Sequence, residues 1–211
     1  MAISLLGFLA GIRVSVIGIT GSIASGKSTA TEFLRRELGY IVVDADKIAR
    51  EVLERGTSGY KAVVETFGVS IIDPITGEIN RQALGGIVFT DPSRRKVLEG
   101  ITHPRIVFRI VCDVIRFRLS GRRVVLDVPL LFESRSPFLR FLCNERFLID
   151  VDPQTQRTRL RNRNPDMPEK QIDDRIKSQM PRNEKLRLAD YVIENNGTID
   201  DFHSSLFSYF R

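Results

Sequence analysis

The stretch that decides the fold is V-S-V-I-G-I-T, residues 14–20, followed by G-S-I-A-S-G-K-S, residues 21–28. The first part is rich in β-branched residues and is typical of a β-strand. The second satisfies the pattern G-x-x-x-x-G-K-[ST], a loop whose glycines let the backbone turn tightly, so that its N–H groups point at phosphates. Apolar residues then recur at helical spacing as far as Leu38, and Gly39 follows as a stop signal. A strand, a glycine-rich loop and a helix in this order predict a nucleotide phosphate site at the helix N-terminus.

The loop residues have expected roles in binding ATP and Mg²⁺. Lys27 should reach the β- and γ-phosphates, and the Ser28 hydroxyl should ligate Mg²⁺. Asp127 ends an apolar strand, as the Mg²⁺-associated acid of such proteins does, although an acid there can also simply cap a turn. The predicted nucleotide-binding residues of the loop are Gly21, Ser22, Ile23, Ala24, Ser25, Gly26, Lys27, Ser28 and Thr29.

Four later apolar runs predict the rest of a sheet. They cover residues 41–43, 124–128, 147–151 and 191–193, and the two longer runs, 124–128 and 147–151, show almost no alternation of apolar and polar residues. Runs of this kind are typical of parallel strands that helices cover on both faces. We therefore expect an α/β fold with a doubly wound, parallel, five-stranded sheet.

The expected organisation is a single domain in which two regions stand apart from the core. The core covers about residues 14–57, 119–156 and 188–211. Residues 58–118 predict a mostly helical insertion, in which the sequence indicates turns at Asp73-Pro74 and Asp91-Pro92 and a helix break at His103-Pro104.

Residues 157–187 form the other region, which is very polar and contains three prolines. Such a segment can be a solvated helical pair, but its arginines and its place after a strand suit a closing lid. Its Arg157, Arg159, Arg161 and Arg163 lie two residues apart, so on one helix they cannot share a face. At most two of them should converge on phosphate, which the planar guanidinium binds bidentately, and the others should be solvated.

The amino-acid composition bears on the partners and the cellular location of the protein. The chain of 211 residues has 32 Lys plus Arg against 26 Asp plus Glu, a mild basic excess that suits an anionic partner without choosing one. Its two cysteines have no metal-ligand spacing and are expected to be reduced and mostly structural. Residues 1–13, read as an N-terminal extension, are too short to span a bilayer and lack the basic start of a signal peptide. We expect a cytoplasmic protein with no stable membrane insertion.

Asp44 and Asp46 follow the second predicted strand in the run D-A-D. Ligands of open α/β sheets bind beyond the carboxyl ends of the strands, where the phosphate loop also lies. One acid at such a position can cap the next helix, which we assign to Asp44. We assign to Asp46 the role of orienting an acceptor hydroxyl and taking its proton.

At this point the residues resemble a known family, dephospho-coenzyme A kinase. Beyond the phosphate loop, the resemblance rests on D-A-D-K-I-A-R-E-V, G-E-I-N-R-Q-A-L, V-F, I-T-H-P, L-D-V-P-L-L-F-E, Q-x-x-R-L-x-x-R-N, S-Q-M and A-D-Y-V-I-E-N-N-G. These motifs run in the order of the family from about Val14 to Gly197. The first and the fifth together are quite specific to it.

The resemblance implies that ATP phosphorylates the ribose 3′-hydroxyl of dephospho-CoA, with Asp46 as the candidate base. It implies that Arg159 and Arg163 act at the lid beside Gln156, and that Asn195 to Gly197 lie near the adenine. The residues that it places near the acceptor are Arg81, His103, Pro129, Leu130, Leu131, Phe132 and Glu133. We expect a monomer whose small-molecule partner is dephospho-CoA and which binds no nucleic acid.

Departures from the family pattern are few. Ser22 and Ala24 stand where the family often has glycine, and Asn80 stands where aspartate is commoner. We expect Asn80 to be structural. A conformational role for His103, beside Pro104, is as consistent with the sequence as a substrate contact.

Two other functions share parts of this pattern. A nucleoside or nucleoside-monophosphate kinase has the same phosphate loop and lid, and acceptor preference would distinguish it. An ATP-dependent switch or nucleic-acid-binding ATPase would suit the basic pI of 9.6. However, the sequence has neither the D-x-x-G and N-K-x-D motifs of a GTPase nor a basic patch interleaved with aromatic residues.

Overall fold

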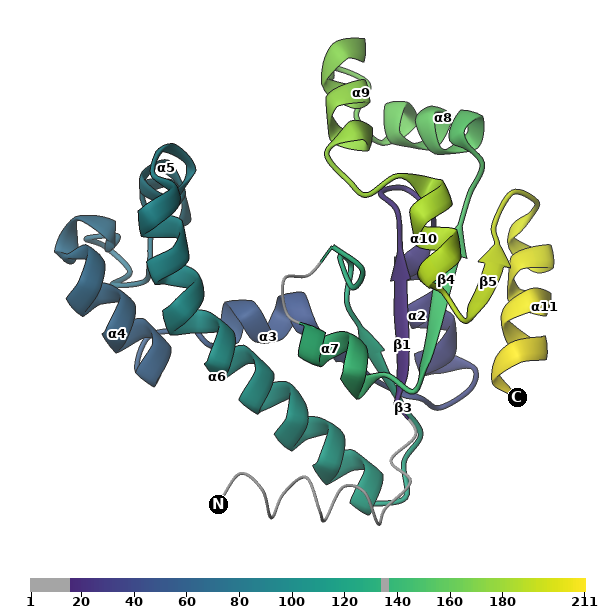
Figure 1. Cartoon of the computed structure of the whole chain (residues 1–211), viewed down its shortest axis with the longest axis horizontal. Helices are drawn as coiled ribbons and strands as arrows, with labels where there is room; N and C mark the ends of the chain where they lie inside the picture. Colours follow the sequence, from purple (N-terminus) through teal and green to yellow (C-terminus); the bar gives the residue numbers. More distant parts are fainter. Residues whose placement is uncertain (1–15, 134–136) are drawn as a thin grey trace. The chain divides into compact units, whose positions relative to one another are not determined.

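The computed structural model describes residues 16–133 and 137–211 (Figure 1). The N-terminal extension and the first two residues of the expected first strand lie outside the described residues. The described chain divides into two compact units: a core unit, with the residues up to Val43 and from Val114 onward, and a second unit, Asp44–Asp113.

The core unit is built on a five-stranded sheet in the order β2-β3-β1-β4-β5. Its strands are β1 (Ile17–Gly21), β2 (Ile41–Asp44), β3 (Val124–Asp127), β4 (Glu145–Asp150) and β5 (Tyr191–Glu194). The pairs of β1 with β3, β1 with β4 and β4 with β5 are parallel. The structure therefore confirms the predicted doubly wound α/β fold, with each strand at the apolar run that predicted it.

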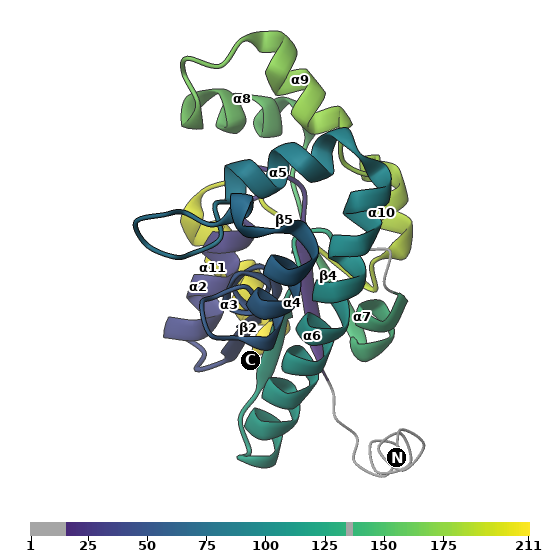
Figure 2. The same ribbon diagram turned by 90° about the vertical axis from the view of Figure 1, so that its left-hand side faces the viewer.

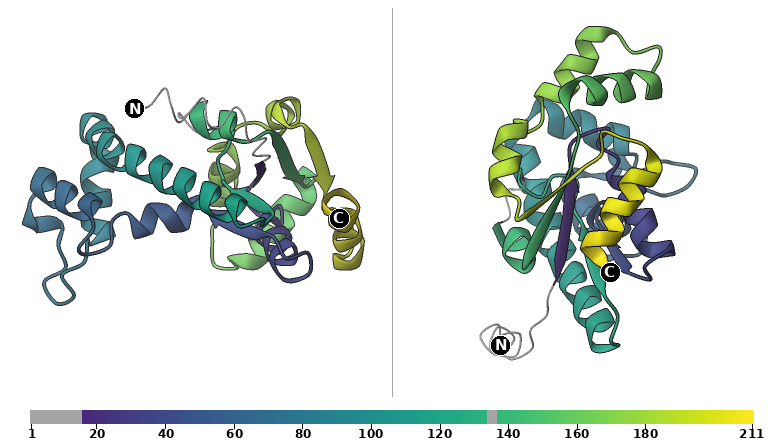
Figure 3. Two further views of the ribbon diagram at one scale, coloured as in Figure 1. Left: turned by 90° about the horizontal axis from the view of Figure 1, so that it is seen from below. Right: turned by 90° about the vertical axis from the view of Figure 1, so that its right-hand side faces the viewer.

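Helices cover both faces of this sheet (Figures 2 and 3). On one side lie α2 (Lys27–Arg36) and α11 (Ile199–Phe210), and on the other lie α7 (Pro137–Leu142) and α10 (Arg182–Leu188). The main core forms between the sheet and the first pair of helices. Its buried side chains are Ile19, Ala30, Leu34, Tyr40, Val125, Phe147, Ile149, Ile193, Phe202, Leu206 and Phe210.

The opposite face of β1 carries Gly18, where the sheet has no room for a side chain. A Cβ there would lie 2.5 Å from the sulfur of Cys143. Cys143 is buried, and desolvation raises the pKa of its thiol to about 12, so the thiol stays protonated at neutral pH. This cysteine packs as a small apolar residue, as the sequence predicted.

The lid region consists of α8 (Pro153–Arg163), α9 (Glu169–Lys177) and the connection to α10. Asp152 caps α8, since its carboxylate accepts the backbone N–H groups of Gln154 and Thr155 at 3.0 and 2.9 Å. Ile172 of α9 is fully buried. The region is thus a pair of charged helices, fixed at its start by the cap.

The second unit is helical, with a small apolar core of its own. It contains α3 (Ala45–Glu51), α4 (Ser58–Phe67), the 3₁₀ turn η1 (Val69–Ile71), α5 (Arg81–Thr90) and most of α6 (Pro92–Leu119). Val63, Ile71 and Leu84 are its buried centre. It begins earlier in the sequence than the expected insertion of residues 58–118, because it includes α3.

One expectation for this region is wrong: α6 does not break at His103-Pro104. The helix runs without interruption from Pro92 to Leu119, with Pro104 inside it. Proline removes one backbone donor and crowds the carbonyl four residues earlier, which belongs here to Gly100. In the next turn, the Arg105 guanidinium donates to the Ile101 carbonyl at 2.6 Å, and Ile101 packs against the apolar core of the unit. Packing therefore outweighs the local signal of the proline.

Candidate active site

The phosphate loop joins β1 to α2 in the conformation that its glycines predict. Gly26 has φ 91° and lies against the Asn195 side chain, so no other residue fits at this position. Ala24 also adopts a left-handed φ, 62°. This conformation favours glycine and costs other residues about 1–2 kcal/mol. The backbone thus gives a physical reason why glycine is common at position 24 in the family that the sequence resembles.

Lys27 and Asp127 meet at the base of this loop. The parallel register of β1 and β3 aligns Asp127 with Ile19, and the Lys27 ammonium forms an ion pair with the Asp127 carboxylate. Asp127 is only 6% exposed. Ser28 and Thr29 lie exposed in the first turn of α2. The structure therefore brings together the lysine and the acid that the sequence assigned to ATP and Mg²⁺, and the Ser28 hydroxyl follows directly in the first turn of α2.

The chemistry of these donors fits a magnesium ion that is bound partly by nucleotide. Asp127 and Ser28 offer oxygen ligands, which Mg²⁺ prefers. In the part of the chain that the structure describes, no cluster of three or more His, Cys, Asp or Glu could hold a metal. Mg²⁺ usually keeps several waters and binds through one or two protein ligands plus substrate phosphates, so two protein oxygens suffice.

A cavity of about 220 Å³ adjoins the phosphate loop. The loop, Arg159 of α8 and the turn after β5 line it together. The side-chain amide of Asn195 donates to the Ser25 carbonyl at 2.8 Å, which ties this turn to the loop. The lining residues are Ala24, Gly26, Thr29, Arg159, Asn195, Gly197 and Ile199. Three segments far apart in the sequence thus meet where the resemblance expected nucleotide.

The lid arginines divide into two groups, as their spacing predicted. Arg157 pairs with Glu169 at 2.5 Å and with Asp173, and Arg161 pairs with Glu169 at 2.6 Å. Among the described residues, no ion pair includes Arg159 or Arg163. Arg157 and Arg161 therefore hold α8 and α9 together, whereas the guanidinium groups of Arg159 and Arg163 are available for an anion.

Sequence reasoning missed the buried lysine of a polar cluster beside the loop, although it named Gln156 and Glu133, which belong to the same cluster. Lys185 of α10 is only 2% exposed, and Gln156 of α8 is 8% exposed. The Lys185 ammonium lies 2.8 Å from Glu133 Oε1. Lysine is rarely buried, so nothing in the charged run around Lys185 could have singled it out.

The V-P-L-L-F-E segment after β3 is partly core. Leu131 and Phe132 are buried, whereas Leu130 is 47% exposed. The Pro129 carbonyl accepts the Thr20 hydroxyl at 3.0 Å, which anchors the segment to the end of β1. Of the five residues of this segment expected near the acceptor, Pro129 to Glu133, Leu130 is therefore the one whose side chain is most open to a ligand.

In the second unit, the two acids of D-A-D have different surroundings. Asp44 caps α3, because its carboxylate accepts the Lys47 backbone N–H at 2.9 Å, as predicted. Asp46, in the first turn of α3, is exposed. No ion pair or hydrogen bond within the described residues occupies its carboxylate. Its side chain is thus available for the proposed chemistry.

Arg81 borders a groove of about 600 Å³ in the same unit. The groove has an apolar floor that includes Leu53, Ile79 and Leu84, and Arg50 and Arg55 also line it. Asn80, just before Arg81, caps α5 by accepting two backbone N–H groups at 3.0 Å, which confirms its structural role. His103 lies exposed on α6 and is not among the groove residues.

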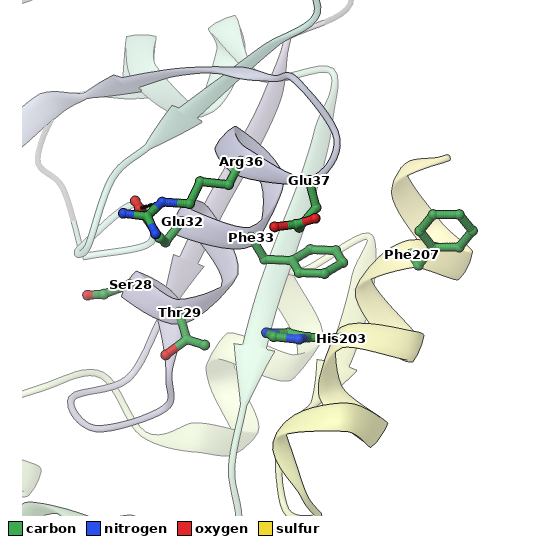
Figure 4. Close-up of a pocket in the computed structure, with 8 residues that line it drawn as sticks. All are labelled: Ser28, Thr29, Glu32, Phe33, Arg36, Glu37, His203 and Phe207. Atoms are coloured by element: carbon green, nitrogen blue, oxygen red, sulfur yellow. Dashed lines mark ion pairs between the residues drawn. The ribbon is translucent and has the colours of Figure 1, made fainter.

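A larger hollow of about 830 Å³ runs along the outer side of α2 toward α11 (Figure 4). Its aromatic rings face one another: Phe33 stacks on His203 with ring centroids 4.4 Å apart. Ser28 and Thr29 lie at one end of the hollow, so it adjoins the phosphate loop. Its other lining residues are Glu32, Arg36 and Glu37 on the outer side of α2 and Phe207 of α11, and Glu32 and Arg36 form an exposed ion pair.

Comparisons with known proteins find relatives that match nearly the whole chain. The family model described as dephospho-CoA kinase matches residues 15–201. A dephospho-CoA kinase of Lactobacillus johnsonii is 44% identical over 191 residues, which are 90% of this chain and 93% of that protein. A dephospho-CoA kinase domain-containing protein of Danio rerio is 42% identical over 89% of this chain and 80% of its own length.

Solved structures show the same architecture. A protein of Thermus thermophilus aligns with a TM-score of 0.73 and 31% identity over 92% of this chain and 95% of its own. A dephospho-CoA kinase of Campylobacter jejuni aligns with a TM-score of 0.70 and 27% identity over 92% of this chain and 94% of its own.

Proposed function

The chain belongs to the dephospho-CoA kinase family, and on that premise we propose that it transfers the γ-phosphate of ATP to the ribose 3′-hydroxyl of dephospho-CoA. The products would be CoA and ADP, and the reaction is the last step of CoA biosynthesis. The observation that carries this proposal is the 44% identity with a dephospho-CoA kinase over 90% of the chain. The ion pair of Lys27 with Asp127 beside a complete phosphate loop supports it.

In this proposal, Lys27 leaves Asp127 for the β- and γ-phosphates when nucleotide binds. Asp127 and Ser28 would then hold Mg²⁺, which would supply positive charge to offset that of the phosphates. Arg159 and Arg163 bind phosphate oxygens from the lid, and Asn195 to Gly197 lie beside the adenine. Catalysis comes mainly from alignment and charge neutralisation.

Asp46 is the proposed base. Its carboxylate orients the acceptor hydroxyl and takes its proton as the phosphoryl group is transferred. The helical unit receives dephospho-CoA. Its groove of about 600 Å³ supports this role, because an apolar floor suits the pantetheine arm and Arg50, Arg55 and Arg81 suit the phosphates of the substrate.

We also propose that the protein acts in the cytoplasm as a monomer without a nucleic-acid partner. The loop, Asp127 and the cavity with Arg159 all come from one chain. None of the described helices is long and apolar enough to cross a bilayer.

The acceptor is tested by ADP release in the presence of Mg-ATP, comparing dephospho-CoA, adenosine, AMP and no acceptor. We expect turnover only with dephospho-CoA, with CoA identified as the product by mass spectrometry. Equal or better turnover with AMP or adenosine would instead favour a nucleoside or nucleoside-monophosphate kinase. Hydrolysis that needs no acceptor but is stimulated by nucleic acid, and that falls steeply with salt, would favour the ATPase.

The lid is tested by a matched pair of arginine variants in α8. Arg159→Ala should lower kcat by roughly 10²-fold, because it removes a donor to a phosphate oxygen. Arg161→Ala removes only an exposed ion pair with Glu169, which contributes about 0–1 kcal/mol, and should stay near wild type. Steady-state kinetics with saturating acceptor measure both variants. Similar losses in the two would mean that the lid arginines act through lid stability and not through phosphate.

A further inference from the structure

Lys185 is a buried lysine that the mechanism above does not use. Its ammonium contacts Glu133 Oε1 at 2.8 Å, Ser22 Oγ at 3.3 Å and Gln179 Oε1 at 3.5 Å. An ammonium group has three donors, so this set engages all of them. The three partners belong to the segment after β3, the phosphate loop and the connection from α9 to α10. Lys185 therefore joins three separate parts of the core unit at one point.

The same cluster holds the phosphate loop by its backbone. Gln179 Oε1 accepts the Ile23 N–H at 2.9 Å, and Gln156 Nε2 donates to the Ile23 carbonyl at 2.9 Å. Gln156 lies in α8 at the start of the lid, and Gln179 lies after α9 at its end. One loop residue is thus fixed on both sides by side chains from the two ends of the lid.

Glu133 makes the buried charge of Lys185 tolerable. Its Oε1 atom also accepts the Met180 N–H at 3.2 Å, so the carboxylate is bonded to both the lid connection and the lysine. Burying an ammonium is costly unless it is paired and hydrogen-bonded. A lysine kept at this cost, with one donor directed at Ser22 of the phosphate loop and one at Gln179, which holds Ile23, indicates a role beyond packing.

We propose that Lys185 is a positioning residue that couples the lid to the phosphate loop. By orienting Gln179 and Ser22, it holds the Ile23 peptide in place, and with it the loop that leads to Gly26 and Lys27. A change in lid position then changes the conformation of the phosphate loop. In turn, the ordered loop holds the base of the lid in place. This inference rests on the proposed function only in requiring that the loop binds ATP.

The test is the affinity of a fluorescent N-methylanthraniloyl ATP analogue, which is measured without any acceptor. Lys185→Met keeps an unbranched side chain that is one atom shorter, and it removes the three donors. We expect about tenfold weaker nucleotide binding and a kcat lowered by roughly 10- to 100-fold, since small misplacements of binding groups can cost 10²-fold. The KM for the acceptor should change by less than about twofold. Because binding is read without an acceptor, a wrong acceptor assignment would leave this result intact.

Two further variants separate positioning from stability. Gln179→Leu removes the acceptor for the Ile23 N–H but leaves the ion pair of Lys185 with Glu133, and it should weaken nucleotide binding several-fold. Arg146→Met breaks an ion pair of 2.7 Å with Asp190 elsewhere in the core unit and should lower thermal stability without changing nucleotide affinity.

Nucleotide affinity within about twofold of wild type in both Lys185→Met and Gln179→Leu would overturn the proposal. An equal loss of affinity in Arg146→Met would overturn it as well, because general destabilisation would then explain the effect. If Lys185→Met does not fold, Gln179→Leu against Arg146→Met decides the question alone.

Discussion

Lys27→Ala is expected to lower kcat by roughly 10³-fold or more and to weaken ATP binding. The ammonium of Lys27 is the single positive charge of the loop that can follow the γ-phosphate during transfer, and it lies already at the base of the loop in its pair with Asp127. Loss of this charge leaves the developing negative charge of the transition state without its nearest neutralising group. The measurement is single-turnover phosphoryl transfer with saturating Mg-ATP, together with the affinity for ATP.

A second substitution at the same position separates charge pairing from catalysis. The Lys27–Asp127 pair is buried, with side chains 14% and 8% exposed, so its loss also costs stability. Lys27→Arg keeps a positive charge beside Asp127 and should recover most of the lost thermal stability. It should remain almost inactive, because a planar guanidinium does not replace a compact ammonium in a tight phosphate loop. Turnover of Lys27→Arg within a few-fold of wild type would show that the lysine serves only to neutralise Asp127.

The sheet and the phosphate loop could be predicted from the sequence because their signals are local. Each strand is an apolar run, and the loop is a fixed pattern whose glycines have a backbone reason, as the left-handed φ of 91° at Gly26 shows. The capping role of Asp44 could be predicted for the same reason, since a cap depends only on the next three residues.

What the sequence could not show depends on contacts between distant segments. Lys185 contacts Ser22 across 163 positions of the chain, and its charged neighbours in sequence make it look like an exposed residue. At Pro104 the prediction was wrong in the opposite direction. The proline is a strong local signal for a helix break, but the packing of α6 outweighs it. Burial is decided by the whole fold, so a rule that reads a few neighbours misses both cases.

Asp46→Asn is the second substitution with a large expected effect. A carboxylate that orients the acceptor hydroxyl and accepts its proton typically contributes about 10²–10⁴-fold, and an amide of the same size cannot take the proton. Because Asp44 and not Asp46 caps α3, the fold should be unaffected. We therefore expect a loss of that size in kcat, with the KM for ATP and for dephospho-CoA changed by no more than a few-fold. Steady-state kinetics and a thermal melt measure the two sides of this expectation.

Asp44→Asn is the matched control, since it makes the same chemical change two residues earlier. Asparagine caps a helix about as well as aspartate, so this variant should keep both stability and turnover. A large loss in Asp46→Asn beside normal activity in Asp44→Asn would assign the proton transfer to one carboxylate of the pair. The reverse pattern would exchange their roles. Near-normal activity in both would remove a carboxylate base from the mechanism and leave positioning by the phosphate loop, the lid and the metal as the source of catalysis.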